Sequence, residues 1–207
     1  MIMFRASMIG DLMATPEKDV LPTGAITVLN TMISQELIKW RDNEFDFVTT
    51  EKGKVCEHES IELYNEVNDT FYVKNIDRIT KGFLTGECDL LDEKESIVID
   101  IKTAYSKKTY PLILKMSKLY EWQLRAYMYL YDVNNAELSY CLVSTPQELI
   151  LNKDQKHWHD VDDVPINLRV SSLRIDRDLE KEKQMLNRLD LSTKYIQESV
   201  KTLEFKR

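Results

Sequence analysis

The sequence has few cysteines and no long apolar run. Its three cysteines, Cys56, Cys88 and Cys141, are far apart and odd in number, which argues against a disulfide framework and against a four-cysteine zinc or iron–sulfur site. No apolar run approaches the roughly 20 residues of a membrane span, and the start of the chain lacks the shape of a signal peptide. We therefore expect reduced thiols, a cytoplasmic location and no membrane partner.

Basic residues are outnumbered by acidic ones, which normally counts against nucleic acid as a partner. The net charge is −7, whereas neutralising phosphates requires clustered Lys and Arg. One segment, residues 101–125, has an excess of basic residues, because Glu121 is its only acidic residue. Its basic residues are Lys102, Lys107, Lys108, Lys115, Lys118 and Arg125. Charge alone leaves two interpretations open, a nucleic-acid surface or a solvated helix face.

Length and pattern predict one α/β domain over residues 1–207, ending in a C-terminal helix. Apolar residues make up 43% of the chain, and no repeat or linker divides it. Periodicity predicts helices at residues 4–14, 23–40, 55–67 and 118–131, with Ser7 as the N-cap of the first and Gly53 opening the third. Two further helices are predicted to begin at Pro146 and at Asp176, which caps the C-terminal helix. It predicts strands at 71–79, 83–91, 97–103, 138–143 and 168–173, and irregular chain at 41–52.

The expected hairpin at residues 86–103 has an unusual second strand. After a charged turn at residues 92–96, an apolar run begins at Ile97 and is interrupted by Asp100 and Lys102. These two side chains share one face, because side chains alternate along a strand. Charges at the end of a buried strand are costly unless they are paired or bound to something. The strand therefore indicates a site.

Four short motifs accompany this strand, each weak alone but specific in combination. They are Gly53-x-x-x-Glu57 on a helix, Gly86-x-x-Asp89 on a strand, Asp100-x-Lys102-Thr103 on the next strand, and Gln123-x-x-x-Tyr127 on the following helix. This set resembles the PD-(D/E)xK nuclease superfamily, in particular its RecB-like branch and the λ-exonuclease-like (YqaJ-type) phage recombination exonucleases. The proline of the family's name is absent, because Cys88 precedes Asp89.

The resemblance implies a fold and a set of site residues. The fold is a restriction-endonuclease-like core, a central mixed β-sheet of about four to five strands flanked by helices. The implied catalytic residues are Glu57, Asp89, Asp100, Lys102 and Gln123. The implied metal ligands are Glu57, Asp89, Asp100 and the backbone carbonyl of Ile101. Oxygen ligands of this kind suit Mg²⁺ or Mn²⁺, while Lys102 would orient the attacking water or stabilise the transition state.

Further residues are expected at the nucleic acid. Residues 4–7 resemble the element with which phage exonucleases hold a 5′-phosphate, and two lysines follow the active strand. Tyr127 lies one turn after Gln123, where packing and DNA contact are equally open. The expected DNA-binding residues are Arg5, Ser7, Lys107, Lys108 and Tyr127. A competing metal motif, His157-Trp158-His159, lacks a third placed ligand, which favours a structural or exposed role.

The implied function is a Mg²⁺- or Mn²⁺-dependent deoxyribonuclease, a 5′→3′ double-strand exonuclease of phage recombination acting on linear duplex ends. Two alternatives stay open: an endonuclease or junction resolvase of the same fold, and a nuclease-fold protein that binds DNA without cutting. The resemblance also implies a homo-oligomer, in some relatives a ring-shaped trimer, and a single-strand annealing protein as partner. A phage-encoded protein of this kind would act in the cytoplasm of a bacterial host.

Overall fold

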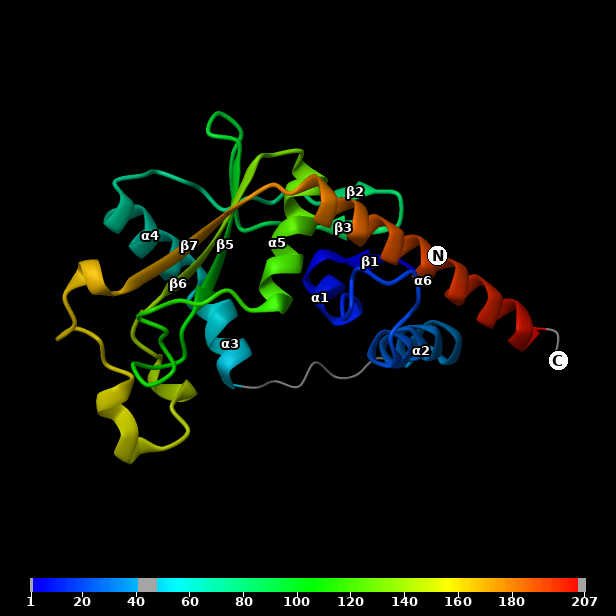
Figure 1. The fold of residues 1–207 in the computed structure, drawn as a ribbon. Coiled ribbons are helices and arrows are strands. Elements are labelled where there is room, and N and C mark those ends of the chain that lie inside the picture. Colours follow the sequence, from blue (N-terminus) through cyan, green and yellow to red (C-terminus); the bar gives the residue numbers. More distant parts are fainter. Residues whose placement is uncertain (1, 41–47, 205–207) are drawn as a thin grey trace.

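A four-stranded mixed sheet forms the centre of the computed structural model, which describes residues 2–40 and 48–204 (Figure 1). Its strands, in spatial order, are β4 (Leu90–Asp92), β5 (Ile97–Thr103), β6 (Asn135–Cys141) and β7 (Val170–Asp176). The middle pair, β5 and β6, is parallel, and both outer pairs are antiparallel. This sheet and its helices confirm the predicted α/β class.

A second, smaller sheet joins the N-terminus to the middle of the chain. Its strands, in spatial order, are β1 (Phe4–Arg5), β3 (Leu84–Gly86) and β2 (Ile79–Lys81). The first pair is parallel and the second antiparallel. Since β3 precedes β4 by only a few residues, the chain passes from the small sheet to the large one between them.

Helices cover both faces of the large sheet (Figure 1). The α-helices are α1 (Ile9–Leu12), α2 (Thr23–Ile38), α3 (Val48–Val55), α4 (Glu57–Asn68), α5 (Lys118–Tyr131) and α6 (Leu179–Glu204). Short 3₁₀ helices are η1 (Ala6–Met8), η2 (Gln147–Leu149), η3 (Lys153–Trp158) and η4 (Ile166–Leu168). Helix α4 packs on one face and α5 on the other, and α6 lies against α5 and α2.

Strand β5 is apolar throughout its first half because both of its faces are buried. Ile97, Ile99 and Ile101 pack in the core under α4, whereas Val98 packs in the core under α5. A strand covered on both faces reads as a continuous apolar run. Each such side chain contributes about 1.5–3 kcal/mol on burial. Asp100 follows Val98 on the α5 face, so the fold places a carboxylate inside this core.

Helix α5 begins and ends at the residues that the sequence predicts. The side chain of Ser117 accepts a hydrogen bond from the backbone N–H of Tyr120 at 3.2 Å, which caps the first turn. Asp132 ends the helix in a left-handed conformation, φ 55°. Trp122 and Tyr127 belong to the core. The aromatic residues of this segment therefore serve mainly to pack α5 on the sheet.

The predicted strand at residues 83–91 is wrong as one element. It is divided into β3 and β4, which belong to different sheets. Gly86 ends β3 where the chain passes closely over the side chains of Ala6, Leu130 and Tyr127. A continuous strand would keep one sheet, whereas this crossing turns the chain before Asp89.

The predicted strand at residues 71–79 is also wrong, because residues 70–78 pair with no strand and only β2 follows them. Hydrogen bonds from a side chain replace part of the backbone hydrogen bonding of a sheet. The side chain of Asn65 bonds the backbone N–H of Tyr72 at 2.9 Å and its carbonyl at 2.8 Å. The N–H of Asn75 donates to the carbonyl of Asp89 at 2.7 Å. These bonds hold the segment extended without a neighbouring strand.

The other corrections concern the bounds of helices and of two strands, since β6 and β7 begin and end at other residues than the predicted strands 138–143 and 168–173. Residues 4–14 start as β1 and η1, so Ser7 is not an N-cap. Gly53 lies inside α3, which occupies residues expected to be irregular; residues 41–47 fall outside the described part. A 3₁₀ turn, η2, follows Pro146. Asp176 ends β7, and Asp178 caps α6 by accepting from the N–H groups of Glu180 and Lys181 at 3.0 and 3.1 Å.

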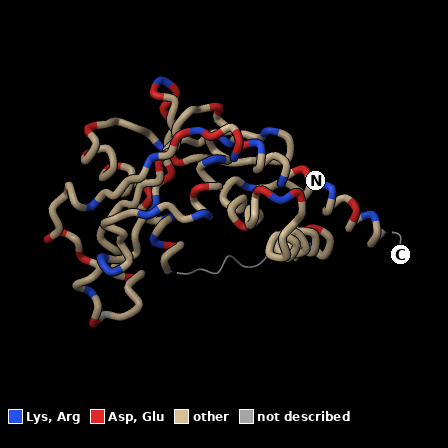
Figure 2. Tube along the Cα trace, viewed as in Figure 1, with Lys and Arg blue, Asp and Glu red and all other residues tan. Residues whose placement is uncertain are grey.

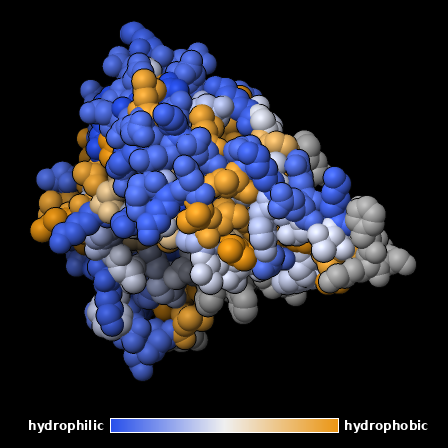
Figure 3. Space-filling view, turned by 45° about the vertical axis from the view of Figure 1, so that its right-hand side comes forward, coloured by the Kyte–Doolittle hydropathy of each residue, from blue (hydrophilic) through white to orange (hydrophobic). Residues whose placement is uncertain are grey.

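Charges of both signs are interspersed along the chain (Figure 2). The basic cluster expected at residues 101–125 is not one surface, because Arg125 is 7% exposed and bonds Glu121 at 2.8 Å. Hydrophilic residues cover most of the face in Figure 3, and apolar residues gather on it in a few places. Within residues 2–40 and 48–204, every helix is too short or too polar to traverse a bilayer.

We predict that Gly86→Ala destabilises the fold. A Cβ at this position would lie 2.8 Å from Leu130 and 2.9 Å from the Cβ of Ala6, and overpacking of this kind costs about 1–3 kcal/mol. Urea unfolding of the two proteins measures the difference. Gly24→Ala in α2 is the matched control, since nothing lies within 4 Å of its added Cβ. An unchanged Gly86→Ala midpoint would contradict the packing described above.

Candidate active site

A cavity of about 650 Å³ opens beside the second half of β5. The residues that line it come from the end of β5 with its neighbour β6, from the helices α3, α4 and α5, and from loops. They are Thr49, Thr50, Gly53, Lys54, Glu57, Lys74, Asp89, Ile101, Lys102, Thr103, Tyr120 and Tyr140. Four predicted site positions, at 57, 89, 101 and 102, are therefore brought together on one cavity.

Asp100 and Lys102 form an ion pair on the α5 face of β5. Lys102 Nζ lies 2.6 Å from Asp100 Oδ2, and Gln123 Nε2 donates to Asp100 Oδ1 at 3.0 Å. Burial disfavours the Lys102 ammonium, but the carboxylates of Asp100 and Asp89 outweigh it and raise the pKa of Lys102. Asp100 is 2% exposed, so its charge depends on these partners. Tyr120 lies under the ammonium, with 5.5 Å between Nζ and the ring centre.

Asp89 lies at the chain crossing just before β4 and reaches over to β5. Its Oδ2 accepts the backbone N–H of Ile101 at 2.7 Å. In an extended strand the N–H and C=O of one residue point to the same side, so the Ile101 carbonyl also faces Asp89. Burial, and then the nearby Asp100 carboxylate, raise the pKa of Asp89 to about 7. The site therefore concentrates more negative charge than Lys102 compensates.

Glu57 begins α4 on the other side of the cavity. Its Oε2 forms an ion pair with Lys74 Nζ, and the side chains of Glu57 and Lys74 are 31% and 41% exposed. The charge of Glu57 is close enough to contribute to the raised pKa of Asp89, after larger effects of burial and Asp100. Glu57 thus lines the same cavity as Asp89, while its carboxylate is engaged by a lysine.

A buried lysine holds the cavity wall in place. Lys52 of α3 is fully buried and donates from Nζ to the carbonyls of Ala104, Tyr105 and Val143 at 2.8, 3.2 and 2.7 Å. These carbonyls follow β5 and β6, so the lysine ties α3 to both strand ends. Burial lowers the pKa of Lys52 to about 8, which leaves it charged at neutral pH. Helix α3 is thereby fixed where Thr49, Thr50 and Gly53 line the cavity.

The residues fit a hard divalent cation, although they do not yet form a closed ligand set. Asp89, Asp100 and the Ile101 carbonyl are oxygen donors of the kind that Mg²⁺ and Mn²⁺ prefer. A cation would relieve the repulsion that raises the pKa of Asp89. In the described part of the chain, no three His, Cys, Asp or Glu side chains already converge as metal ligands. Glu57, whose Oε2 contacts Lys74, would complete the set.

The structure places the residues expected at DNA in different surroundings. Arg5 and Ser7 are exposed at β1 and η1 but do not line the cavity. Lys107 pairs with Asp163, and Lys108 lies with Nζ 4.8 Å from the ring centre of Trp158. Tyr127 is 6% exposed, and its hydroxyl accepts from Gln123 at 3.1 Å. The position of Tyr127 therefore favours packing, the first of its two interpretations.

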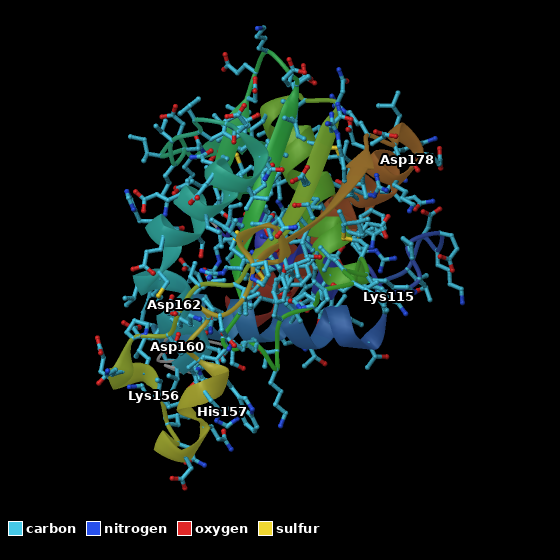
Figure 4. The ribbon with its side chains drawn as sticks, turned by 90° about the vertical axis from the view of Figure 1, so that its left-hand side faces the viewer. Lys115, Lys156, His157, Asp160, Asp162 and Asp178 are labelled. Carbon is cyan, nitrogen blue, oxygen red and sulfur yellow. The ribbon has the colours of Figure 1, made fainter. Side chains whose placement is uncertain are left out.

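The histidine motif lies apart from the cavity. Figure 4 shows His157 with Lys156, Asp160 and Asp162 at one end of the molecule, away from Asp178 at the start of α6. His159 is 4% exposed, and its Nδ1 bonds Thr145 Oγ1 at 3.0 Å. Burial lowers the pKa of His159, which favours the neutral ring. These contacts agree with a structural role for His159.

Sequence reasoning missed Lys52 and Lys74, two lysines that shape the cavity. Lys52 belongs to a stretch taken as irregular, and its carbonyl partners are 52 to 91 residues away. Lys74 stands in the segment 71–79, which the sequence predicts as a strand. No local pattern signals either contact, because both depend on how distant segments pack.

We predict that Asp89→Asn stabilises the metal-free protein at pH 8. Because the pKa of Asp89 is raised in the folded state, the folded protein keeps the carboxyl proton up to about pH 7. The unfolded chain loses this proton near pH 4, so the folded protein loses stability as the pH rises from about 4 to 7. Asn carries no charge, so the variant should gain on the order of 1–4 kcal/mol at pH 8, less than half of that at pH 5 and little at pH 3. Urea unfolding in EDTA at several pH values measures this.

Asp92 is the matched control for that experiment. Hydrogen bonds from the Glu95 N–H and the Tyr72 hydroxyl lower the pKa of Asp92, so Asp92→Asn should reduce stability at pH 8. If both variants shift stability in the same direction, the burial of Asp89 is not the source of the effect.

Comparisons with known proteins agree with this geometry. A comparison with curated proteins found no match. Among solved structures, a phage related exonuclease from Haemophilus somnus 129PT is similar over 98% of this chain and 96% of its own, with TM-score 0.88 and 23% identity. The alkaline exonuclease LHK-Exo from Laribacter hongkongensis is similar over 99% of this chain and 95% of its own, with TM-score 0.68 and 16% identity. At these identities the likeness establishes the fold.

The sequence itself matches one family model. Residues 29–204 match the PD-(D/E)XK nuclease superfamily, a span that includes α4, β4, β5 and α5 and hence every residue of the cavity described above. The restriction-endonuclease-like fold expected from the motifs is confirmed. The chain belongs to the PD-(D/E)XK nuclease superfamily.

Proposed function

We propose that this nuclease is a divalent-metal-dependent deoxyribonuclease, and that it degrades linear duplex DNA from a 5′ end. The observation that carries the proposal is the pair of aspartates beside Lys102, of which Asp100 is buried and Asp89 is half-buried at the cavity. Asp89 has its pKa raised by burial and by Asp100, and the Lys102 ammonium lies 2.6 Å from Asp100. An excess of carboxylate beside a fixed ammonium, open to a cavity, suits phosphodiester hydrolysis.

Each residue of the site has a distinct role in this proposal. Asp89, Asp100, Glu57 and the Ile101 carbonyl would hold Mg²⁺ or Mn²⁺, which when bound activates water and neutralises charge on the phosphate. Lys102 donates a charged hydrogen bond to the attacking water or to the phosphate oxygen that gains charge. Gln123 is a positioning residue, because it bonds Asp100 and fixes that carboxylate relative to Lys102.

Two observations on relatives support the choice of an exonuclease. The structures of similar fold are described as a phage related exonuclease and an alkaline exonuclease. LHK-Exo has also been crystallised with dAMP, a deoxynucleoside monophosphate. A mononucleotide is what an exonuclease releases, whereas an endonuclease leaves longer fragments. Arg5, Ser7, Lys107 and Lys108 are the proposed contacts to the DNA backbone.

The wider biological setting is proposed on the same resemblance. The chain would act as one nuclease domain over residues 1–207, in a phage recombination system within the bacterial cytoplasm. A homo-oligomer, such as a ring-shaped trimer, and a single-strand annealing partner complete that proposal. Size measurement of the purified protein by light scattering tests the first of these two assemblies directly.

We predict that Lys102→Ala strongly slows DNA cleavage while the protein still folds. Loss of the charged donor should lower the rate by about 10²–10³, measured on linear duplex DNA with Mn²⁺ or Mg²⁺. Lys183→Ala, an exposed site on α6, should cleave like the wild type. Unchanged cleavage by Lys102→Ala, or by Asp100→Ala, would refute the proposed site.

A second prediction separates exonuclease from endonuclease. The wild type should release mononucleotides from a linear duplex and leave the same DNA intact as a closed circle, because an exonuclease needs an end. Duplexes with either a 5′-phosphate or a 5′-hydroxyl, analysed on denaturing gels, report strand polarity. Nicking or linearisation of the circle would favour the endonuclease or resolvase alternative instead.

A further inference from the structure

Lys74 pairs with the carboxylate of Glu57, which lines the cavity from the start of α4. Its Nζ pairs with Glu57 Oε2, and both residues line the cavity with Asp89 and Lys102. The Lys74 side chain is 41% exposed. It is therefore accessible to a bound ligand while it contacts a carboxylate of the proposed metal site.

The backbone around Lys74 is fixed to both sides of the cavity, although residues 70–78 form no helix or strand. On one side, Asn65 of α4 bonds the N–H and the carbonyl of Tyr72 at 2.9 and 2.8 Å. On the other, the Asn75 N–H donates to the Asp89 carbonyl at 2.7 Å, and Asn75 Nδ2 donates to the Cys88 carbonyl at 3.0 Å. The Cα of Lys74 is thus held between the helix of Glu57 and the segment of Asp89.

Glu57 cannot serve a divalent cation and the Lys74 ammonium in the same way. The two cations compete for the Glu57 carboxylate, which the Lys74 ammonium already contacts at Oε2, and they repel each other when both are near it. Lys74 has a flexible four-carbon stem, so its charged end can leave Glu57 while its backbone stays in place. An ammonium that remains in the cavity beside a bound cation would face the DNA phosphates.

We propose that Lys74 alternates between two partners, pairing with Glu57 before a divalent cation binds and contacting a DNA phosphate oxygen afterwards. The proposal rests on the proposed function, since it takes Glu57 as a metal ligand. In it, Lys74 lowers the affinity for the free cation and adds affinity for DNA once the cation is bound. The protein therefore completes its metal site most readily when substrate is present.

Calorimetric titration with Mn²⁺ in the absence of DNA tests the first partner. Lys74→Met removes the competing ammonium and should tighten Mn²⁺ binding about two- to fivefold, the size of one exposed ion pair. The same substitution in a Glu57→Gln background should change the Mn²⁺ affinity little, because the contact is already absent. If the effect persists in that background, Lys74 acts only as a distant charge and the proposal is overturned.

Anisotropy of a fluorescent duplex tests the second partner. With Mn²⁺ and the cleavage-deficient Lys102→Ala protein, adding Lys74→Met should weaken DNA binding and reduce the slope of log Kd against log salt by about one. Lys194→Met is the matched control, because Lys194 pairs with Asp190 at 2.7 Å on α6, away from the cavity. It should change neither the Mn²⁺ affinity nor the salt slope.

The outcomes separate this inference from the proposed function. A wild-type protein whose Mn²⁺ uptake is absent, or is unaffected by Asp89→Asn and Asp100→Asn, refutes the metal site and this inference with it. Carboxylate-dependent uptake with no tightening in Lys74→Met, or with an unchanged salt slope, overturns the role of Lys74 alone. Tightening that requires Glu57, together with the smaller slope, establishes it.

Discussion

The close approach of Asp89 and Asp100 inside the fold is the constraint on which the rest of the structure depends. Two like charges in a buried place repel, and this repulsion together with burial raises the pKa of Asp89. Neighbouring groups partly offset the repulsion. Lys102 forms an ion pair with Asp100, Gln123 donates a hydrogen bond to Asp100, and the Ile101 N–H donates one to Asp89. Since these partners do not remove the excess charge, the site favours a cation.

Much of the scaffold can be understood as the means of bringing these carboxylates together. Asp100 lies on a strand buried on both faces, whereas Asp89 comes from the crossing between two sheets. Gly86 allows that crossing, because the backbone there passes closely over α5 and η1. Lys52 fixes α3 to the ends of β5 and β6 and so completes the cavity wall. The neighbouring carboxylates destabilise the fold, and the packing around them offsets this cost.

The elements with strong local signals were predictable from the sequence. The strand at residues 97–103 and the helix at residues 118–131 have the boundaries expected for them. Alternation along the strand also placed Asp100 and Lys102 on one face, where they form an ion pair. The division of residues 83–91 and the irregular course of residues 70–78 were not predictable, because contacts with α5 and Asn65 override local strand propensity. The catalytic roles of the site residues stay predictions.

The sequence by itself determined which residue types could do chemistry here, and in which order they follow one another. The carboxylates, Lys102 and Gln123 are visible as motifs because strand and helix periodicity operate over a few residues. Only the tertiary structure decided how these groups meet: that Glu57 pairs with Lys74, that Asp89 crosses to β5, and that Tyr127 is buried. Those contacts join segments far apart in the chain, so their geometry depends on packing that no local pattern encodes.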